Sequence, residues 1–127
     1  MKVPAFFVKK AIVKGSFRNV IEAGRPVGFE LTIKNKLGLG TLVGCSSVVI
    51  SGNDYPIDKL LVIKGDKEYS ASDINESMPL TFKFGDEIVL RMMDGKGLDP
   101  GKYEISTAID LVGIGRVDIS YKDELKG

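Results

Sequence analysis

The segment Val27-Gly28-Phe29-Glu30-Leu31-Thr32-Ile33-Lys34 decides the fold. Apolar side chains occupy its odd positions, and from Glu30 onward polar side chains occupy the even positions between them. This period of two predicts a β-strand with one face in the core and one face in solvent. The same alternation returns after residue 102, where the apolar set is Tyr103, Ile105, Ile109 and Leu111.

A third alternating segment, residues 80–92, is interrupted by Gly85-Asp86. A bend or bulge at Gly85 is expected, because the apolar residues keep the same parity on both sides of it. Turn-forming clusters rich in Gly, Pro, Asn and Asp separate the segments. The apolar positions predicted to share a core face are Leu80, Phe82, Phe84, Ile88, Leu90 and Met92.

The remaining elements are shorter. Residues 11–22 predict an N-terminal strand broken by Gly15, and a capping pattern after Ser70 predicts a short helix near 70–77. Frequent strands with Gly/Pro turns and almost no helix are typical of an antiparallel β-sandwich. We therefore predict an all-β protein, with residues 1–127 forming a single sandwich domain.

The chain of 127 residues contains no histidine, no tryptophan and a single cysteine. This composition excludes Ser-His-Asp and Cys-His catalysis and every zinc site that uses histidine. One cysteine also excludes an internal disulfide. We predict no catalytic, cofactor-binding or metal-binding residue in this chain, and we interpret Cys45 as a small buried residue.

Carboxylates are the remaining candidates for acid–base chemistry. Asp54 and Asp58 flank a Tyr-Pro pair, and Asp86 and Glu87 are adjacent. Adjacent strand residues point to opposite faces, so we interpret the second pair as turn and surface residues. The loop at residues 94–99 lacks the ligand spacing of a calcium loop and is interpreted as a hairpin connection.

Charge is unevenly distributed along the chain. Residues 1–64 carry ten Lys/Arg and four Asp/Glu, whereas residues 65–127 carry eight against thirteen. No aromatic residues alternate with Lys9, Lys10 and Lys14 as a single-strand nucleic-acid binder requires, so nucleic acid is not expected as a partner. No signal-peptide pattern and no apolar run of membrane-spanning length are visible, so we expect a cytoplasmic protein without a membrane partner.

One loop is unusually apolar. Residues 35–44 hold four aliphatic side chains among three glycines, with a single charge. Either the segment is a flexible strand that crosses under the core, or it is a loop that docks on a partner. The residues predicted for such an interface are Lys36, Leu37, Gly38, Leu39, Gly40 and Leu42. Residues 111–119 are apolar on both faces if the preceding strand continues, which also suggests cover by another layer or chain.

The order of these segments resembles the β subunit of the bacterial C-glycoside deglycosidases. The resemblance rests on the Val27-Gly28-Phe29-Glu30-Leu31 strand, the glycine-rich loop after it and the Gly97-Leu98-Asp99-Pro100-Gly101 turn, and it spans residues 12–121. It departs from the family pattern at Lys36-Leu37-Gly38-Leu39-Gly40, where the family has an arginine and aromatic residues. A flavonoid substrate is therefore not transferred to this protein.

The resemblance implies a small, non-catalytic β-sandwich subunit that assembles with a larger α subunit. That α subunit has a sugar-isomerase-like (β/α)-barrel, binds a divalent metal, usually manganese, and supplies the histidine base. The complex cleaves the carbon–carbon bond between a 3-keto sugar and its aglycone, a lyase reaction. The alternative hypothesis is a stand-alone carbohydrate-binding module that uses Tyr55 and Tyr69 as platforms.

Overall fold

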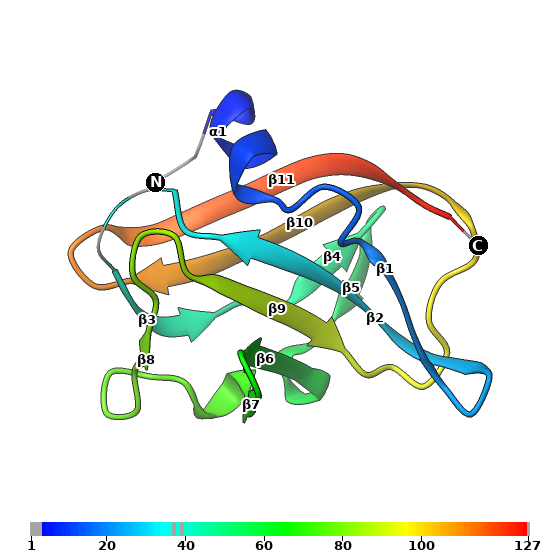
Figure 1. Ribbon diagram of the computed structural model, residues 1–127, viewed down its shortest axis with the longest axis horizontal. Helices are drawn as coiled ribbons and strands as arrows, with labels where there is room; N and C mark the ends of the chain where they lie inside the picture. The colour runs from blue at the N-terminus through cyan, green and yellow to red at the C-terminus, as the bar shows by residue number, and fades with distance from the viewer. Residues whose placement is uncertain (1–3, 37, 39, 127) are drawn as a thin grey trace.

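The computed structural model describes residues 4–36, 38 and 40–126. Two antiparallel sheets pack face to face (Figure 1), which confirms the predicted all-β sandwich. In spatial order, the first sheet contains β1 (Arg18–Glu22), β2 (Arg25–Lys34), β9 (Glu87–Met92), β6 (Leu60–Lys64) and β7 (Lys67–Ser70). The second contains β5 (Asn53–Tyr55), β4 (Val48–Ile50), β10 (Gly101–Leu111), β3 (Thr41–Cys45) and β8 (Leu80–Thr81), with β11 (Gly115–Leu125) paired to β10.

The core lies between the sheets and follows the predicted alternation. In β2, Phe29, Leu31 and Ile33 are buried, and the register places them opposite Met92, Leu90 and Ile88 of β9. In β10, every second side chain from Ile105 to Leu111 is buried, and the small side chain of Ala108 is buried as well. Period-two patterns therefore located the inner faces of the longest strands correctly. The side chains with no more than 1% exposure are Phe29, Leu31, Leu42, Val48, Ile50, Leu60, Val62, Ala71, Phe82, Ile88, Met92, Ile105 and Leu125.

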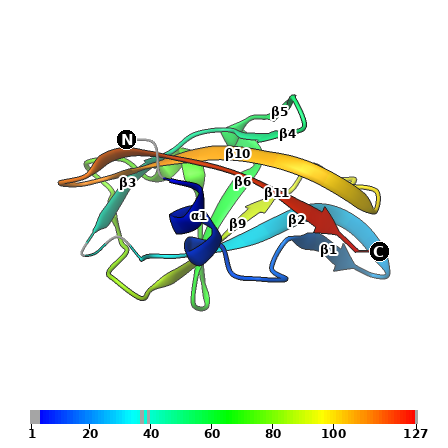
Figure 2. The same cartoon turned by 90° about the horizontal axis from the view of Figure 1, so that it is seen from above.

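The N-terminal segment is helical at its start, which corrects the expected strand over residues 11–22. Helix α1 (Ala5–Ala11) precedes β1, so only Arg18–Glu22 is strand. Val8 and Ile12 lie four residues apart, a spacing that places both side chains on one helix face. Figure 2 shows α1 between β11 and β2, at the open side of the sandwich, where burial of that face favours helix over strand.

The short helix expected near 70–77 is present only as one 3₁₀ turn, η2 (Ala71–Asp73). After it, Asn75 Oδ1 accepts hydrogen bonds from the backbone N–H groups of Ser77 and Met78, at 2.8 and 3.0 Å. A side chain that bonds its own local backbone in this way competes with helix formation. A second 3₁₀ turn, η1 (Ile57–Lys59), links β5 to β6.

The apolar stretch 111–119 is not one continuous strand, because a turn at residues 112–114 interrupts it. The second sheet's long strand β10 ends at Leu111, the chain turns, and β11 begins at Gly115. The interruption predicted at Gly85 is confirmed, because this glycine has a φ of 89° and lies in the connection between β8 and β9. Among the described residues, no helix is long and apolar enough to cross a membrane.

Candidate functional site

Two of the carboxylates considered for catalysis, Asp54 and Asp86, have structural partners. Asp54 Oδ1 accepts a hydrogen bond from Ser47 Oγ at 2.8 Å. Asp94 Oδ1 accepts the backbone N–H groups of Lys96 and Gly97, at 3.0 and 2.9 Å, as expected of a hairpin loop. Within residues 4–36, 38 and 40–126, no three Cys, Asp or Glu side chains lie close enough together to hold a metal ion.

The Cys45 thiol is half-buried and poorly suited to nucleophilic chemistry. Burial, together with the nearby Asp110 carboxylate, raises the pKa of Cys45 to about 12. The thiolate is the reactive form of cysteine, so this thiol remains protonated and inert near neutral pH.

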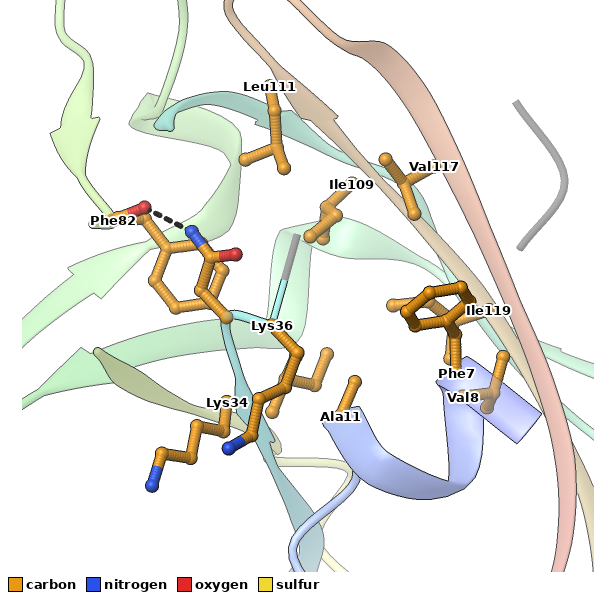
Figure 3. A pocket seen from close by; sticks show the side chains of 12 residues that line it. Phe7, Val8, Ala11, Lys34, Lys36, Phe82, Ile109, Leu111, Val117 and Ile119 are labelled. Carbon is orange, nitrogen blue, oxygen red and sulfur yellow. Dashed lines mark hydrogen bonds between the residues drawn. The ribbon is translucent and has the colours of Figure 1, made fainter. Parts of the chain in front are cut away.

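A small cavity lies beneath α1, between β2, β10 and β11 (Figure 3). Its walls are almost wholly apolar, and its volume is about 30 Å³. This volume holds about one water molecule, whereas pockets for small-molecule ligands measure about 300–1,000 Å³. The cavity is therefore a packing defect of the core and not a sugar site. The side chains around it include Phe7, Val8, Ala11, Ile33, Phe82, Ile109, Leu111, Val117 and Ile119.

One end of the sandwich is built around the side chain of Asn35. This side chain is buried, and its Nδ2 donates to the carbonyl oxygens of Gly38, at 2.7 Å, and Phe82, at 2.6 Å. The second of these bonds is the dashed line in Figure 3. The Asn35 backbone makes two more hydrogen bonds to the β8–β9 connection, each 2.8 Å long. Its N–H donates to the carbonyl oxygen of Asp86, and its carbonyl oxygen accepts the N–H of Gly85. Asn35 thus ties the loop after β2 to the β8–β9 connection.

The turn between β10 and β11 joins the same end. The N–H of Val112 donates to the carbonyl oxygen of Thr41 at 2.9 Å, directly after the glycine-rich loop. Phe82 donates its N–H to the carbonyl oxygen of Gly40 at 3.1 Å. Three connections that are distant in sequence therefore meet at the left end of the molecule in Figure 1.

Two large apolar side chains among the described residues of this end face solvent. Phe84 is 60% exposed and Val112 is 57% exposed. We call these two residues and the exposed Lys36, which lie on the three connections at this end, the loop-end patch. Exposed apolar groups that gather on one surface mark sites of protein contact more often than scattered ones do.

The exposure of Phe84 corrects the sequence prediction that it faces the core. The strand β8 ends at Thr81, and Asp86 Oδ2 then accepts the N–H of Lys83 at 2.8 Å, which closes a tight turn. This turn breaks the alternation, so Phe82 stays buried while Phe84 points away from the core. The alternation of apolar residues did not indicate that Phe84 is exposed, although Gly85 indicated an interruption of the strand next to it.

The predicted interface residues have different positions. Lys36 is exposed, and Gly38 and Gly40 are half-buried at the same end as the loop-end patch. Leu42 is fully buried within the core of its own chain and cannot anchor a partner directly. The predicted anchors Leu37 and Leu39 lie outside the described residues. The end of the loop enters the core through Leu42, as the interpretation of a strand under the core requires. The interpretation of a loop that docks on a partner stays a prediction.

The two tyrosines considered as sugar platforms are half-buried and pack against the core. Tyr55 also contacts Phe29 edge-to-face, with ring centroids 5.0 Å apart. A stacking platform needs an open ring face, and these packing contacts occupy part of each ring.

Comparison with known protein families matches residues 7–112 to the C-glycoside deglycosidase beta subunit. This match covers most of the chain, from α1 to the turn after β10. The chain belongs to the C-glycoside deglycosidase beta subunit family. The curated proteins contain no match to it. In this family member, the matched range includes the whole loop-end patch and stops before β11.

Proposed function

We propose that this protein is the non-catalytic β subunit of a two-subunit, metal-dependent C-glycoside deglycosidase. The complex would cleave the carbon–carbon bond of a 3-keto C-glycoside, a lyase reaction of carbohydrate metabolism. The β subunit would stabilise a (β/α)-barrel α subunit and shape the entrance of its active site. A free, half-buried thiol at Cys45 suits a reducing compartment, and we place the complex in the cytoplasm.

The chemistry of the reaction supports this division of labour. Carbon–carbon cleavage next to a ketone requires a base to move a proton and an electrophile to hold the enolate charge. This chain has no histidine, and its half-buried cysteine is held in the protonated form. In our proposal the barrel subunit supplies the base and binds a divalent metal, manganese, as the electrophile.

The loop-end patch is the observation that carries the proposal. Phe84 and Val112 are large apolar groups exposed on connections that hydrogen bonds hold in place. A surface that is apolar and already ordered loses little conformational entropy when a partner covers it. We therefore assign the contact with the barrel subunit to this end of the sandwich.

Co-expression of the chain with a candidate (β/α)-barrel α subunit tests the proposal. We expect a stable hetero-oligomer that cleaves a 3-keto C-glycoside, while neither subunit alone sustains full activity. Phe84→Ser and Val112→Ser should weaken the complex, because each removes apolar area from the contact.

Ile21→Ser is the matched control, since Ile21 is 56% exposed on β1, and the β1–β2 hairpin lies at the opposite end of the sandwich in Figure 1. It should leave assembly unchanged. A barrel subunit that is fully stable and active alone would contradict the proposal, and so would turnover by the isolated β subunit. An equal effect of the Ile21 variant would contradict the assignment of the contact.

A further inference from the structure

The strand β11 forms an edge of the second sheet. It pairs along its whole length with β10, from Gly101 opposite Leu125 to Leu111 opposite Gly115. No strand within the described part of the chain pairs with its other edge. Helix α1 packs on the side of β11 that faces the first sheet, as Figure 2 shows. A long unpaired edge is a template for strand addition.

The hydrogen bonds of β10 identify which backbone groups of β11 face outward. Ala108 exchanges hydrogen bonds with Ser46, through its N–H to Ser46 Oγ and through its C=O from the Ser46 N–H. Glu104 likewise bonds Ser51 on the β4 side. The backbone N–H and C=O groups of the even-numbered residues of β10 therefore point away from β11. Those of its odd-numbered residues point toward β11.

The register transfers this alternation to β11. Odd residues of β10 lie opposite odd residues of β11, such as Ile105 opposite Tyr121. The odd residues of β11 therefore use their N–H and C=O groups on β10, and the even residues offer theirs to the open edge. The even residues, which also place their side chains on the outer face, are Arg116, Asp118, Ser120, Lys122 and Glu124.

We propose that β11 pairs antiparallel with β11 of a second copy of this chain, with Ser120 on the two-fold axis. In that register, Arg116 lies opposite Glu124 of the second copy and Asp118 lies opposite its Lys122. The two-fold axis repeats both contacts, so the pairing contains four opposite-charge pairs and no like-charge pair. Each opposite-charge pair directly across two strands is favourable.

The neighbouring registers lack this complementarity. With Ile119 on the axis, Arg116 opposes Lys122, and with Tyr121 on the axis, Asp118 opposes Glu124. With the axis at Asp118 or at Lys122, that residue opposes its own copy. Like charges directly opposite each other are destabilising, so the sequence of β11 selects the Ser120 register. In the single chain, Arg116 Nε contacts Asp118 Oδ1 at 3.0 Å, and the surface exposure of both side chains leaves them within reach of a second strand.

Disulfide trapping in the full-length chain tests both the pairing and its register. Two opposite Cα atoms in a hydrogen-bonded pair are about 5.5 Å apart, a distance that a disulfide spans. Ser120→Cys should therefore cross-link under mild oxidation. Glu124→Cys is the matched control, because the two copies of residue 124 would lie about 26 Å apart in this register. The high pKa of Cys45 keeps its thiol from competing.

Charge exchange provides a second, reversible test by sedimentation velocity. Lys122→Asp should weaken self-association at least about tenfold, because it places like charges opposite each other twice per dimer. Adding Asp118→Lys should restore association, since the opposed charges are complementary again. Lys67→Asp, the same charge change on β7 of the other sheet, should have no effect.

A chain that is monomeric at high micromolar concentration would overturn the proposal. So would cross-linking of the Glu124 variant in preference to the Ser120 variant, or failure of the double exchange to restore association while circular dichroism shows a folded protein. All measurements use the isolated chain, so their outcome is independent of the barrel partner. The family match also ends before β11, so the inference concerns a strand outside it.

Discussion

Glu30 is a carboxylate that the cross-strand register buries. The alternating pattern placed it on the outer face of β2, and it lies there, but its side chain is only 4% exposed. Arg18 of β1 and Arg91 of β9 are its register neighbours on either side. Their Nε atoms contact its two carboxylate oxygens at 3.0 and 2.7 Å. Burial of a carboxylate charge is costly unless oppositely charged partners compensate for the lost hydration, as these two arginines do.

We expect Glu30→Ala to lower the free energy of unfolding by about 1–3 kcal/mol, because it leaves the partly buried Arg91 without its closest partner. Arg18→Ala should cost less than about 1 kcal/mol, because Arg18 is mostly exposed. Urea denaturation of the two variants measures both values. Equal losses would contradict this account of the cluster.

We expect the contribution of Asp86 to the stability of the fold to depend on pH. The N–H of Lys83 and the ammonium of Lys64 lower the pKa of the Asp86 carboxyl below its ordinary value. A depressed pKa means that the ionised form is favoured in the folded state, so its contribution is complete above about pH 4 and is lost as the pH falls through the folded-state pKa. Unfolding measured from neutral to acidic pH should show a smaller acid-induced loss for Asp86→Asn than for the unmodified chain. Identical pH profiles would contradict the assignment.

At the scale of elements, close approach of strands explains two glycines. A Cβ on Gly28 would collide with the carbonyl oxygen of Met92, which belongs to the backbone of β9. A Cβ on Gly44 would meet only the carboxylate of Asp110, at 2.8 Å, and that side chain can rotate. Both glycines lie within strands, so the two positions differ in what surrounds them.

Gly28→Ala should therefore destabilise the protein by about 1–3 kcal/mol through forced backbone shifts. Gly44→Ala should cost less than about 1 kcal/mol, because a flexible side chain makes room at little cost. Thermal unfolding of the two variants compares them directly. A larger loss for Gly44→Ala would show that Asp110 is fixed in place.

The elements also show where local sequence is an incomplete guide. Residues 27–33 and 103–111 are strands as predicted, because their alternation is long and one face is buried. The N-terminal segment has no such alternation, and its helix depends on the surface that β2 and β11 provide. The alternation of the sequence predicted a buried Phe84. The turn closed by the hydrogen bond from the Lys83 N–H to Asp86 instead leaves its side chain exposed.

For the molecule as a whole, α1 closes the open side of the sandwich. Within this helix, Val8 is 3% exposed, while Phe6 is 59% exposed. Val8→Ala should lower the free energy of unfolding by about 1–3 kcal/mol, because it removes buried apolar volume above the existing cavity. Phe6→Ala should change it by less than about 1 kcal/mol. Chemical denaturation tests the pair, and equal effects would contradict the closing role of α1.

The amino-acid sequence by itself determined the all-β class, the inner faces of the long strands and the absence of histidine chemistry, because alternation and composition are local properties of the chain. The family was also visible in the order of its segments. Only the tertiary structure decided that Asn35 joins the loop connections, that Leu42 enters the core and that Phe84 and Val112 are exposed. These outcomes depend on contacts between segments far apart in the chain, and no local pattern encodes which distant backbone groups will satisfy a buried polar side chain.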